Sequence, residues 1–289
     1  MSPRAVAGPT RFTARVTPRG NRERLQEIAA SLTERDVLFL DFLFEHKVLT
    51  TDQICELFFN SRPRTRDRLL RLLELGLIRR TRPQKRPGSL PYHYVLDMLG
   101  ALVVSEFRGI ELSELGFRLD RRLGIIEGSR LRHLRDINSF LSRLTFACRH
   151  SDGQYRVVRA WSEDRCRSRW NDNVTPDALV ELEGSDASIS SFLELDRATE
   201  NLDRLTQKLG RYRLVSGTPN APKALLFCVP SIARETNARE ALYNCGLVVA
   251  TTTLDRHLAD PLGAVWRPLR ADYRVRLIDL ASTQDGETR

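Results

Sequence analysis

The sequence contains little lysine and few cysteines. Only four of the 46 basic residues are lysines, so arginine supplies nearly all of the positive charge. The five cysteines are odd in number, widely scattered and never spaced as a Cys-x-x-Cys pair. This pattern argues against a disulfide framework or a cysteine-based zinc site and indicates reduced, mostly buried thiols.

Several functional motifs are also absent. No apolar run approaches the roughly 18 residues that a membrane helix needs, and Met1 to Asn21 is polar and lacks the apolar stretch of a secretory signal. The chain has no phosphate-binding or dinucleotide-binding glycine motif, no nucleophile elbow and no His-x-x-x-His spacing. We therefore expect a cytoplasmic protein without membrane contact, and nothing supports ATP-driven, dinucleotide or zinc chemistry.

The chain is long enough for two hydrophobic cores. It has 289 residues, 41% of them hydrophobic and 29% charged, which is typical of a folded protein. The net charge of +9 and the pI near 9.7 favour a polyanionic partner such as nucleic acid.

The first half has the pattern of a winged helix-turn-helix. Three helical patterns follow one another between Leu32 and Leu75, with Thr33, Thr51 and Asn60 or Ser61 as expected helix caps. Two extended stretches, 77–82 and 92–96, flank a basic segment rich in proline and glycine, and a fourth helix begins at Asp97. This order of three helices and a hairpin predicts a DNA-binding domain.

The basic residues of this half are expected to contact double-stranded DNA. The third helix carries five arginines, and the hairpin, or wing, can contact the phosphate backbone. Spacing places Arg64, Arg68 and Arg71 near one outer face. The alternative is a solvated basic face on a winged helix that binds proteins. The predicted DNA contacts are Arg62, Arg64, Arg66, Arg68, Arg71, Arg79, Arg80, Arg82, Lys85 and Arg86.

The second half predicts an α/β sandwich around a mixed sheet, which makes the fold class α/β (α+β). A long amphipathic helix from Ser129 to His150 precedes short strands rich in Val, Leu and Phe. The expected strands are 155–163, 178–183, 191–196, 224–230, 247–252 and 264–268, with helices at 199–214 and 232–244. The expected domains are a flexible basic arm (1–30), the winged helix (31–108), a connector (109–128), the α/β domain (129–280) and a disordered tail (281–289).

Three carboxylates give the sharpest chemical signal. Asp177 begins one strand, and Glu194 and Asp196 lie on the next, where the two-residue period of a strand places both on one face. Convergent carboxylates can bind Mg²⁺, which can activate water for phosphodiester cleavage. Lys208, at the edge of the apolar face of the following helix, could reach this site. Alternatively, these carboxylates are ordinary turn and edge charges.

These residues resemble a known family. Thr175-Pro176-Asp177-Ala178, the segment from Phe192 to Glu200, and Lys208-Leu209 with Tyr212 look like the PD-(D/E)XK nuclease superfamily. With the Arg-rich helix ending at Leu75-Gly76-Leu77, residues 32 to 270 resemble the replication-relaxation family of actinobacterial plasmids and mobile elements. The resemblance implies a winged helix followed by a restriction-endonuclease-like domain.

One position departs from the nuclease pattern, because Asp196 stands where that superfamily has lysine. In an active enzyme, Asp177 and Glu194 would hold Mg²⁺, Asp196 or Glu163 would assist, and Lys208 would orient water or steady the phosphate. Alternatively, the domain binds DNA without cleaving it.

Three functions therefore stay open at this point: a DNA-binding factor of plasmid replication or transfer, a Mg²⁺-dependent nicking endonuclease, and a transcriptional repressor. Other replication or transfer proteins and a second copy of the chain are further possible partners.

Overall fold

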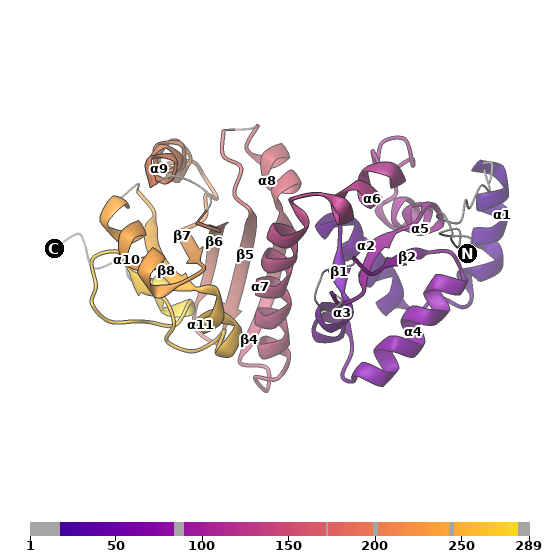
Figure 1. Cartoon of the computed structure of the whole chain (residues 1–289), viewed down its shortest axis with the longest axis horizontal. Coiled ribbons are helices and arrows are strands. Elements are labelled where there is room, and N and C mark those ends of the chain that lie inside the picture. Colours follow the sequence, from indigo (N-terminus) through magenta and orange to yellow (C-terminus); the bar gives the residue numbers. More distant parts are fainter. Residues whose placement is uncertain (1–17, 84–89, 172, 199–201, 243–245, 283–289) are drawn as a thin grey trace, which may run out of the picture.

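The computed structural model describes residues 18–83, 90–171, 173–198, 202–242 and 246–282, and they form two units side by side (Figure 1). We call residues 18–128 the N-terminal unit and residues 129–282 the C-terminal unit. None of the described helices has the length and apolar character needed to cross a membrane.

The N-terminal unit combines helices with a small antiparallel sheet, whose strands lie in the order β1-β3-β2. Its elements are α1 (Pro18–Ala29), α2 (Glu34–His46), β1 (Leu49–Thr50), α3 (Thr51–Phe58), α4 (Arg62–Glu74), β2 (Ile78–Thr81), β3 (His93–Leu96), α5 (Met98–Arg108) and α6 (Leu119–Glu127).

Local sequence explains where these helices begin and end. Thr33 caps α2 in a capping box with Asp36, and Asp97 caps α5, both as predicted. Helix α3 is capped by Thr50 rather than by the predicted Thr51. Gly76 has a φ of +76°, a conformation that glycine adopts without strain, and it turns the chain from α4 into β2.

Two segments are more ordered than the sequence suggests. Pro18–Ala29 falls within the predicted flexible arm but forms α1, which packs against α5 and buries Ile28 in the core of this unit. The expected connector contains α6 and the buried Leu115. Residues 18–29 contain three arginines and only two large apolar residues, so their composition resembles that of exposed chain. Residues 109–128 contain three arginines but eight large apolar residues, a composition that permits a packed helix. The rest of the predicted arm and tail, residues 1–17 and 283–289, lies outside the described residues.

The C-terminal unit is built on a mixed sheet with the strand order β4-β5-β6-β7-β8-β9. The β4-β5-β6 and β8-β9 pairs are antiparallel, whereas β6-β7-β8 are parallel. Its elements are α7 (Leu131–Arg149), β4 (Tyr155–Ser162), α8 (Glu163–Arg169), β5 (Ala178–Gly184), β6 (Ser188–Leu195), α9 (Leu202–Ser216), β7 (Ala224–Val229), α10 (Ile232–Ala241), β8 (Val248–Thr253), α11 (Leu254–Ala259), β9 (Arg267–Pro268) and the 3-10 helix η1 (Ile278–Ala281).

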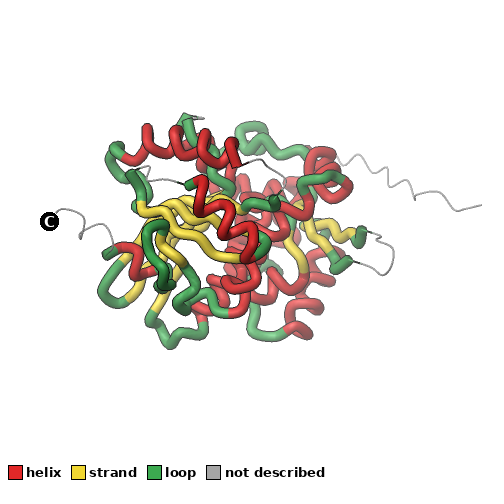
Figure 2. The backbone as a smooth tube through the Cα atoms, turned by 60° about the vertical axis from the view of Figure 1, so that its left-hand side comes forward, coloured by secondary structure: helices red, strands yellow, loops and turns green. Residues whose placement is uncertain are grey.

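Each face of this sheet has its own core, and helices cover both faces (Figure 2). Leu193 of β6 packs with Phe140 of α7 on one face. The neighbouring Phe192 packs with Leu209 of α9 and Ala238 of α10 on the other. The predicted mixed α and β architecture is therefore confirmed, and α8 and α11 are additions that the sequence did not indicate.

Helix α7 joins the two units through buried polar contacts. The Asn138 amide donates to the carbonyl oxygens of Val48 at 2.6 Å and His46 at 3.3 Å. From the other side, the Gln53 amide donates to the Arg135 carbonyl at 2.8 Å and the Ser139 hydroxyl at 2.9 Å. Leu131 and Leu134 of the same helix pack with Val48 and Val95.

Candidate functional site

Helix α4 presents a basic surface on the N-terminal unit. Thr65, Leu69 and Leu72 form its buried face, and Pro63 in the first turn is compatible with helix initiation. The side chains of Arg62, Arg64, Arg66 and Arg71 are exposed.

Arg68 does not belong to this exposed surface, so its predicted position beside Arg64 and Arg71 was wrong. Its Nε donates to Asp36 Oδ1 at 2.8 Å, its Nη2 also bonds Asp36 Oδ2, and Nη2 reaches the Ser31 carbonyl at 2.9 Å. Burial alone would raise the pKa of Asp36, but the hydrogen bonds from Arg68 and Thr33 outweigh it and lower that pKa. Arg68 is a structural residue that ties α4 to α2.

The exposed arginines of α4 differ in whether a nearby carboxylate already neutralises their charge. Arg62 lies 3.1 Å from Asp52, and Arg71 lies 3.3 Å from Glu74, both at exposed positions where such pairs are weak. Arg64 and Arg66 form no ion pair with any other residue that the structure describes. They are the arginines of α4 with most charge to offer a ligand.

The hairpin continues the basic surface. Arg79 is 2.8 Å from Asp97, whereas the guanidinium groups of Arg80 and Arg82 lie 4.4 and 5.1 Å from the centre of the Tyr92 ring. Stacking on the ring holds both groups at the base of the hairpin without neutralising them. Lys85 and Arg86, the predicted contacts at its tip, lie outside the described residues.

The predicted carboxylates gather at one edge of the larger sheet. Asp177 precedes β5, and its Oδ2 accepts a hydrogen bond of 2.8 Å from the backbone nitrogen of Leu195 on β6. Its Oδ1 lies 2.9 Å from His133 Nε2 on α7. Burial would lower the pKa of His133, but the hydrogen bond with Asp177 outweighs it, so that pKa is raised.

Glu194 is buried next to this position, with 3% of its surface exposed. Lys208 Nζ lies 2.8 Å from its Oε2, and the Tyr212 hydroxyl donates to its Oε1 at 2.6 Å. The expected approach of Lys208 to this carboxylate is therefore observed. Burial, and then the charge of Asp177, raise the pKa of Glu194 to about 7, against the opposing effects of Lys208 and Tyr212.

Asp196 and Glu163 are held by arginines. Asp196 follows β6 on the same side as Glu194, as the strand period predicted; its Oδ2 is 2.5 Å from Arg234 Nε on α10, and its Oδ1 accepts from the Ala198 backbone nitrogen at 2.8 Å. Glu163, the third expected metal ligand, accepts from Arg130 at 2.5 Å and from Arg167 at 2.6 Å.

This arrangement does not fit the expected Mg²⁺ site. Glu194 has both oxygens engaged, and the oxygens of Glu163 are both paired with arginines. Across the described residues, no group of three or more His, Cys, Asp or Glu side chains is placed to hold a metal ion. Side-chain and backbone donors of the protein already engage the carboxylate oxygens that a divalent ion would need as ligands.

Five partners of these carboxylates were not identified as such from the sequence: His133, Arg234, Arg130, Arg167 and, as a hydrogen-bond donor, Tyr212. His133 and Arg234 lie 44 and 38 residues from the carboxylates that they contact. No local pattern marks such pairs, although the spacing of Lys208 and Tyr212 by one helical turn could have indicated a shared target.

The molecule is thus an α+β protein. It has a basic helix in one unit and, in the other, a cluster of carboxylates that are paired with basic side chains. A family model described as replication-relaxation matches residues 40–226, more than half of the chain, and the protein belongs to that family. Comparisons with curated proteins and with solved structures gave no match.

Proposed function

We propose that this protein binds double-stranded DNA through α4 of a winged helix-turn-helix, in the replication or transfer of a plasmid or mobile element. The observation that carries the proposal is the exposed N-terminal half of α4, where Arg64 and Arg66 have no ion-pair partner within the described chain. Membership of the replication-relaxation family supports the same role.

The order of the elements supports this mode of binding. In helix-turn-helix proteins the N-terminal residues of the recognition helix approach the base edges, and guanidinium groups suit both phosphates and guanine. Arg64 and Arg66 can bind without first breaking an internal ion pair. Arg80 and Arg82 would add phosphate contacts from the hairpin.

The first prediction concerns α4. Replacing Arg64 and Arg66 with alanine should weaken DNA binding and reduce the slope of log K against log salt by about one for each phosphate that the variant no longer neutralises. Fluorescence anisotropy with a labelled duplex over a salt series measures both quantities. Arg213→Ala, an exposed helical arginine in the C-terminal unit, is the matched control. Equal affinities and slopes for all proteins would refute this surface and favour the protein-docking alternative.

We further propose that the C-terminal unit is a PD-(D/E)XK-like domain that serves binding rather than cleavage. Lys208 lies 2.8 Å from Glu194 and Arg234 lies 2.5 Å from Asp196, so the acidic charges that would recruit a metal are already compensated. The proximity of Lys208 to Glu194 is also the observation that favours the alternative, a Mg²⁺-dependent nicking endonuclease.

The second prediction separates these two functions. Supercoiled plasmid incubated with the protein and Mg²⁺ should remain supercoiled, as measured on an agarose gel. Nicking by the wild type that disappears in both Asp177→Ala and Glu194→Ala would establish the endonuclease instead. Nicking that persists in both variants would point to a contaminating nuclease.

A further inference from the structure

A cavity of about 640 Å³ lies between the two units, and its lining includes no residue of α4 and none of the four carboxylates described above. Side chains from α2, α5 and α6 of the N-terminal unit and from α8 of the C-terminal unit line it. A ligand in this cavity would contact both units at once.

Two guanidinium groups face this cavity without an ion-pair partner. Arg122 of α6 lies 5.1 Å from the centre of the Phe44 ring and 5.8 Å from that of Phe117. Arg165 of α8 lies 4.8 Å from the centre of the Trp161 ring. Within the part of the chain that is described, neither guanidinium makes an ion pair or a hydrogen bond. Aromatic stacking orients the two groups but leaves their N–H donors available.

The carboxylates in the cavity wall are already engaged. Asp41 lies 2.6 Å from Arg108, and Asp164 lies 2.7 Å from Lys47. Glu45 accepts hydrogen bonds from the backbone nitrogen and the hydroxyl of Ser162 at 3.1 and 2.9 Å. Glu45 still interacts electrostatically with both guanidinium groups and Asp164 with that of Arg122, but among the described residues no carboxylate forms an ion pair with Arg122 or Arg165.

Burial makes the charge of Arg122 costly. Burial lowers the pKa of Arg122, and the negative charges of Asp164 and Glu45 offset this effect only in part. A guanidinium that is partly removed from water and lacks a hydrogen-bonded anion is stabilised by any anion that reaches it.

We propose that this cavity binds a small phosphate-bearing molecule, whose oxyanion is held between Arg122 of one unit and Arg165 of the other. Each guanidinium presents several N–H donors in a planar fork, which suits a phosphate group. Bound there, the phosphate connects the two units and stabilises their contact. This site does not depend on the proposed function in DNA binding.

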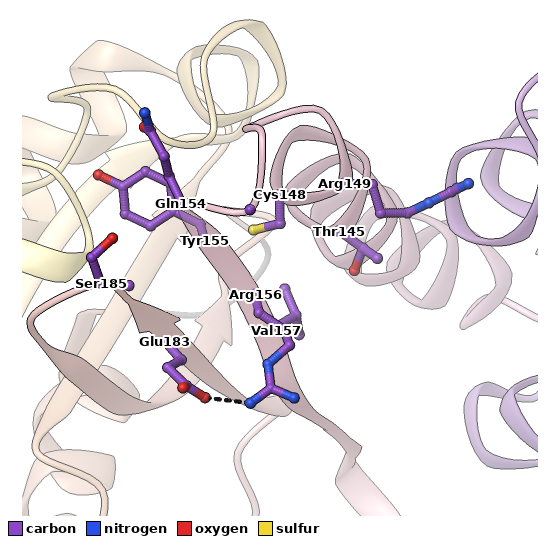
Figure 3. Close-up of a pocket in the computed structure, with 11 residues that line it drawn as sticks. Thr145, Cys148, Arg149, Gln154, Tyr155, Arg156, Val157, Glu183 and Ser185 are labelled. Carbon is purple, nitrogen blue, oxygen red and sulfur yellow. Dashed lines mark hydrogen bonds and ion pairs between the residues drawn. The ribbon is translucent and has the colours of Figure 1, made fainter.

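A second pocket shows that arginines in a pocket wall are not by themselves enough to form an anion site. The pocket of about 530 Å³ between the end of α7 and the paired strands β4 and β5 is lined by Arg149 and Arg156 among others (Figure 3). Arg156 is paired with Glu183 at 2.7 Å, and Arg149 donates to the Glu56 carbonyl at 2.8 Å and to Asn60 at 2.6 Å. Arg156 is therefore the matched control for an arginine in a cavity wall.

Calorimetric titration of the full-length protein with inorganic phosphate, at constant ionic strength set with NaCl, tests the site. We expect saturable binding by the wild type, a rise in Kd of about tenfold or more in Arg122→Met and in Arg165→Met, and an unchanged Kd in Arg156→Met. Arg165→Met keeps the test decisive if Arg122→Met fails to fold, because the Arg165 side chain is exposed.

Three results would overturn the proposal: no saturable binding of phosphate by the wild type, the same weakening in Arg156→Met, or unchanged Kd values in both site variants.

A separate measurement addresses DNA as the source of the phosphate. If Arg122→Met and Arg165→Met lower duplex affinity as much as Arg64→Ala does, the cavity is part of the DNA interface. Duplex affinity that stays unchanged while phosphate binding disappears supports a separate small-molecule site.

Discussion

At the scale of single residues, Glu194 combines burial with a partly compensated charge. Its carboxylate is 3% exposed and lies near that of Asp177, so ionisation is disfavoured despite Lys208 and Tyr212. A carboxylate held this way is nearly balanced between its protonated and ionised forms at neutral pH, because its pKa is about 7.

This balance predicts a pH dependence of stability. The pKa of Glu194 is raised from its ordinary 4.5 to about 7, so the folded state binds more protons between these values, and the free energy of unfolding should fall as pH rises through that window. Relative to Glu194→Gln, the wild type should lose about 3 kcal/mol at most. Urea unfolding at pH 5 to 8 measures this difference. If the free energies of unfolding of the two proteins changed in parallel with pH, this prediction would be contradicted. The control is Glu183→Gln, at a half-buried position on β5.

Residue patterns in the sequence predicted part of this cluster. The strand period placed Glu194 and Asp196 on one face, and helical spacing brought Lys208 to its edge. The pattern could not reveal that Arg234 and Arg130 would pair with Asp196 and Glu163. Such contacts depend on how separate helices dock, which no local spacing encodes.

At the scale of elements, α4 is fixed to its neighbours by a buried ion pair. Asp36 is 1% exposed, accepts hydrogen bonds from Arg68, and caps α2 together with Thr33. One carboxylate therefore orients the proposed recognition helix and begins another helix.

Removing Arg68 should be far more damaging than removing an exposed arginine of α4. In Arg68→Ala the buried charge of Asp36 loses its partner, and the free energy of unfolding should fall by about 3 kcal/mol. Arg64→Ala, on the same helix, should change it by less than about 0.5 kcal/mol. Chemical denaturation of both variants gives these values. Similar decreases in the two would mean that Arg68 has no special structural role.

Periodicity predicted the longer elements better than the short ones. Helices such as α2, α4 and α7 repeat apolar residues on one face over at least three turns, which distinguishes them from loops. Helix α8 spans only 163–169 and contains three arginines, so it carries no comparable signal. Its order depends on the burial of Cys166 and on the Ser162 cap, which become evident only when the sheet is assembled.

At the scale of the whole molecule, α7 belongs to both halves. Phe140 and Leu144 pack on the larger sheet, while Asn138, Leu131 and Leu134 face the N-terminal unit. Its buried polar contacts also fix the position of α7 along the N-terminal unit, because Asn138 donates hydrogen bonds to two backbone carbonyls of that unit.

This sharing predicts that both units unfold together. Asn138→Ala removes the side-chain donor to the carbonyls of His46 and Val48, of which His46 keeps its bond from the Val48 backbone nitrogen. The substitution should lower the free energy of unfolding by about 1 to 3 kcal/mol. Calorimetry should still record one transition, shifted to lower temperature. The exposed Asn173→Ala should not shift it. Two resolved transitions, of which only one moves, would show that the units unfold independently.

The position of α7 also limits how such a protein can be recombined in evolution. An N-terminal unit exchanged between relatives would have to meet the same face of α7 and present two backbone carbonyls to Asn138. Exchange at the chain segment before Leu131 keeps α7 with the sheet on which Phe140 and Leu144 pack. We therefore expect viable chimeras to be those whose new N-terminal unit fits the face of α7 formed by Leu131, Leu134 and Asn138.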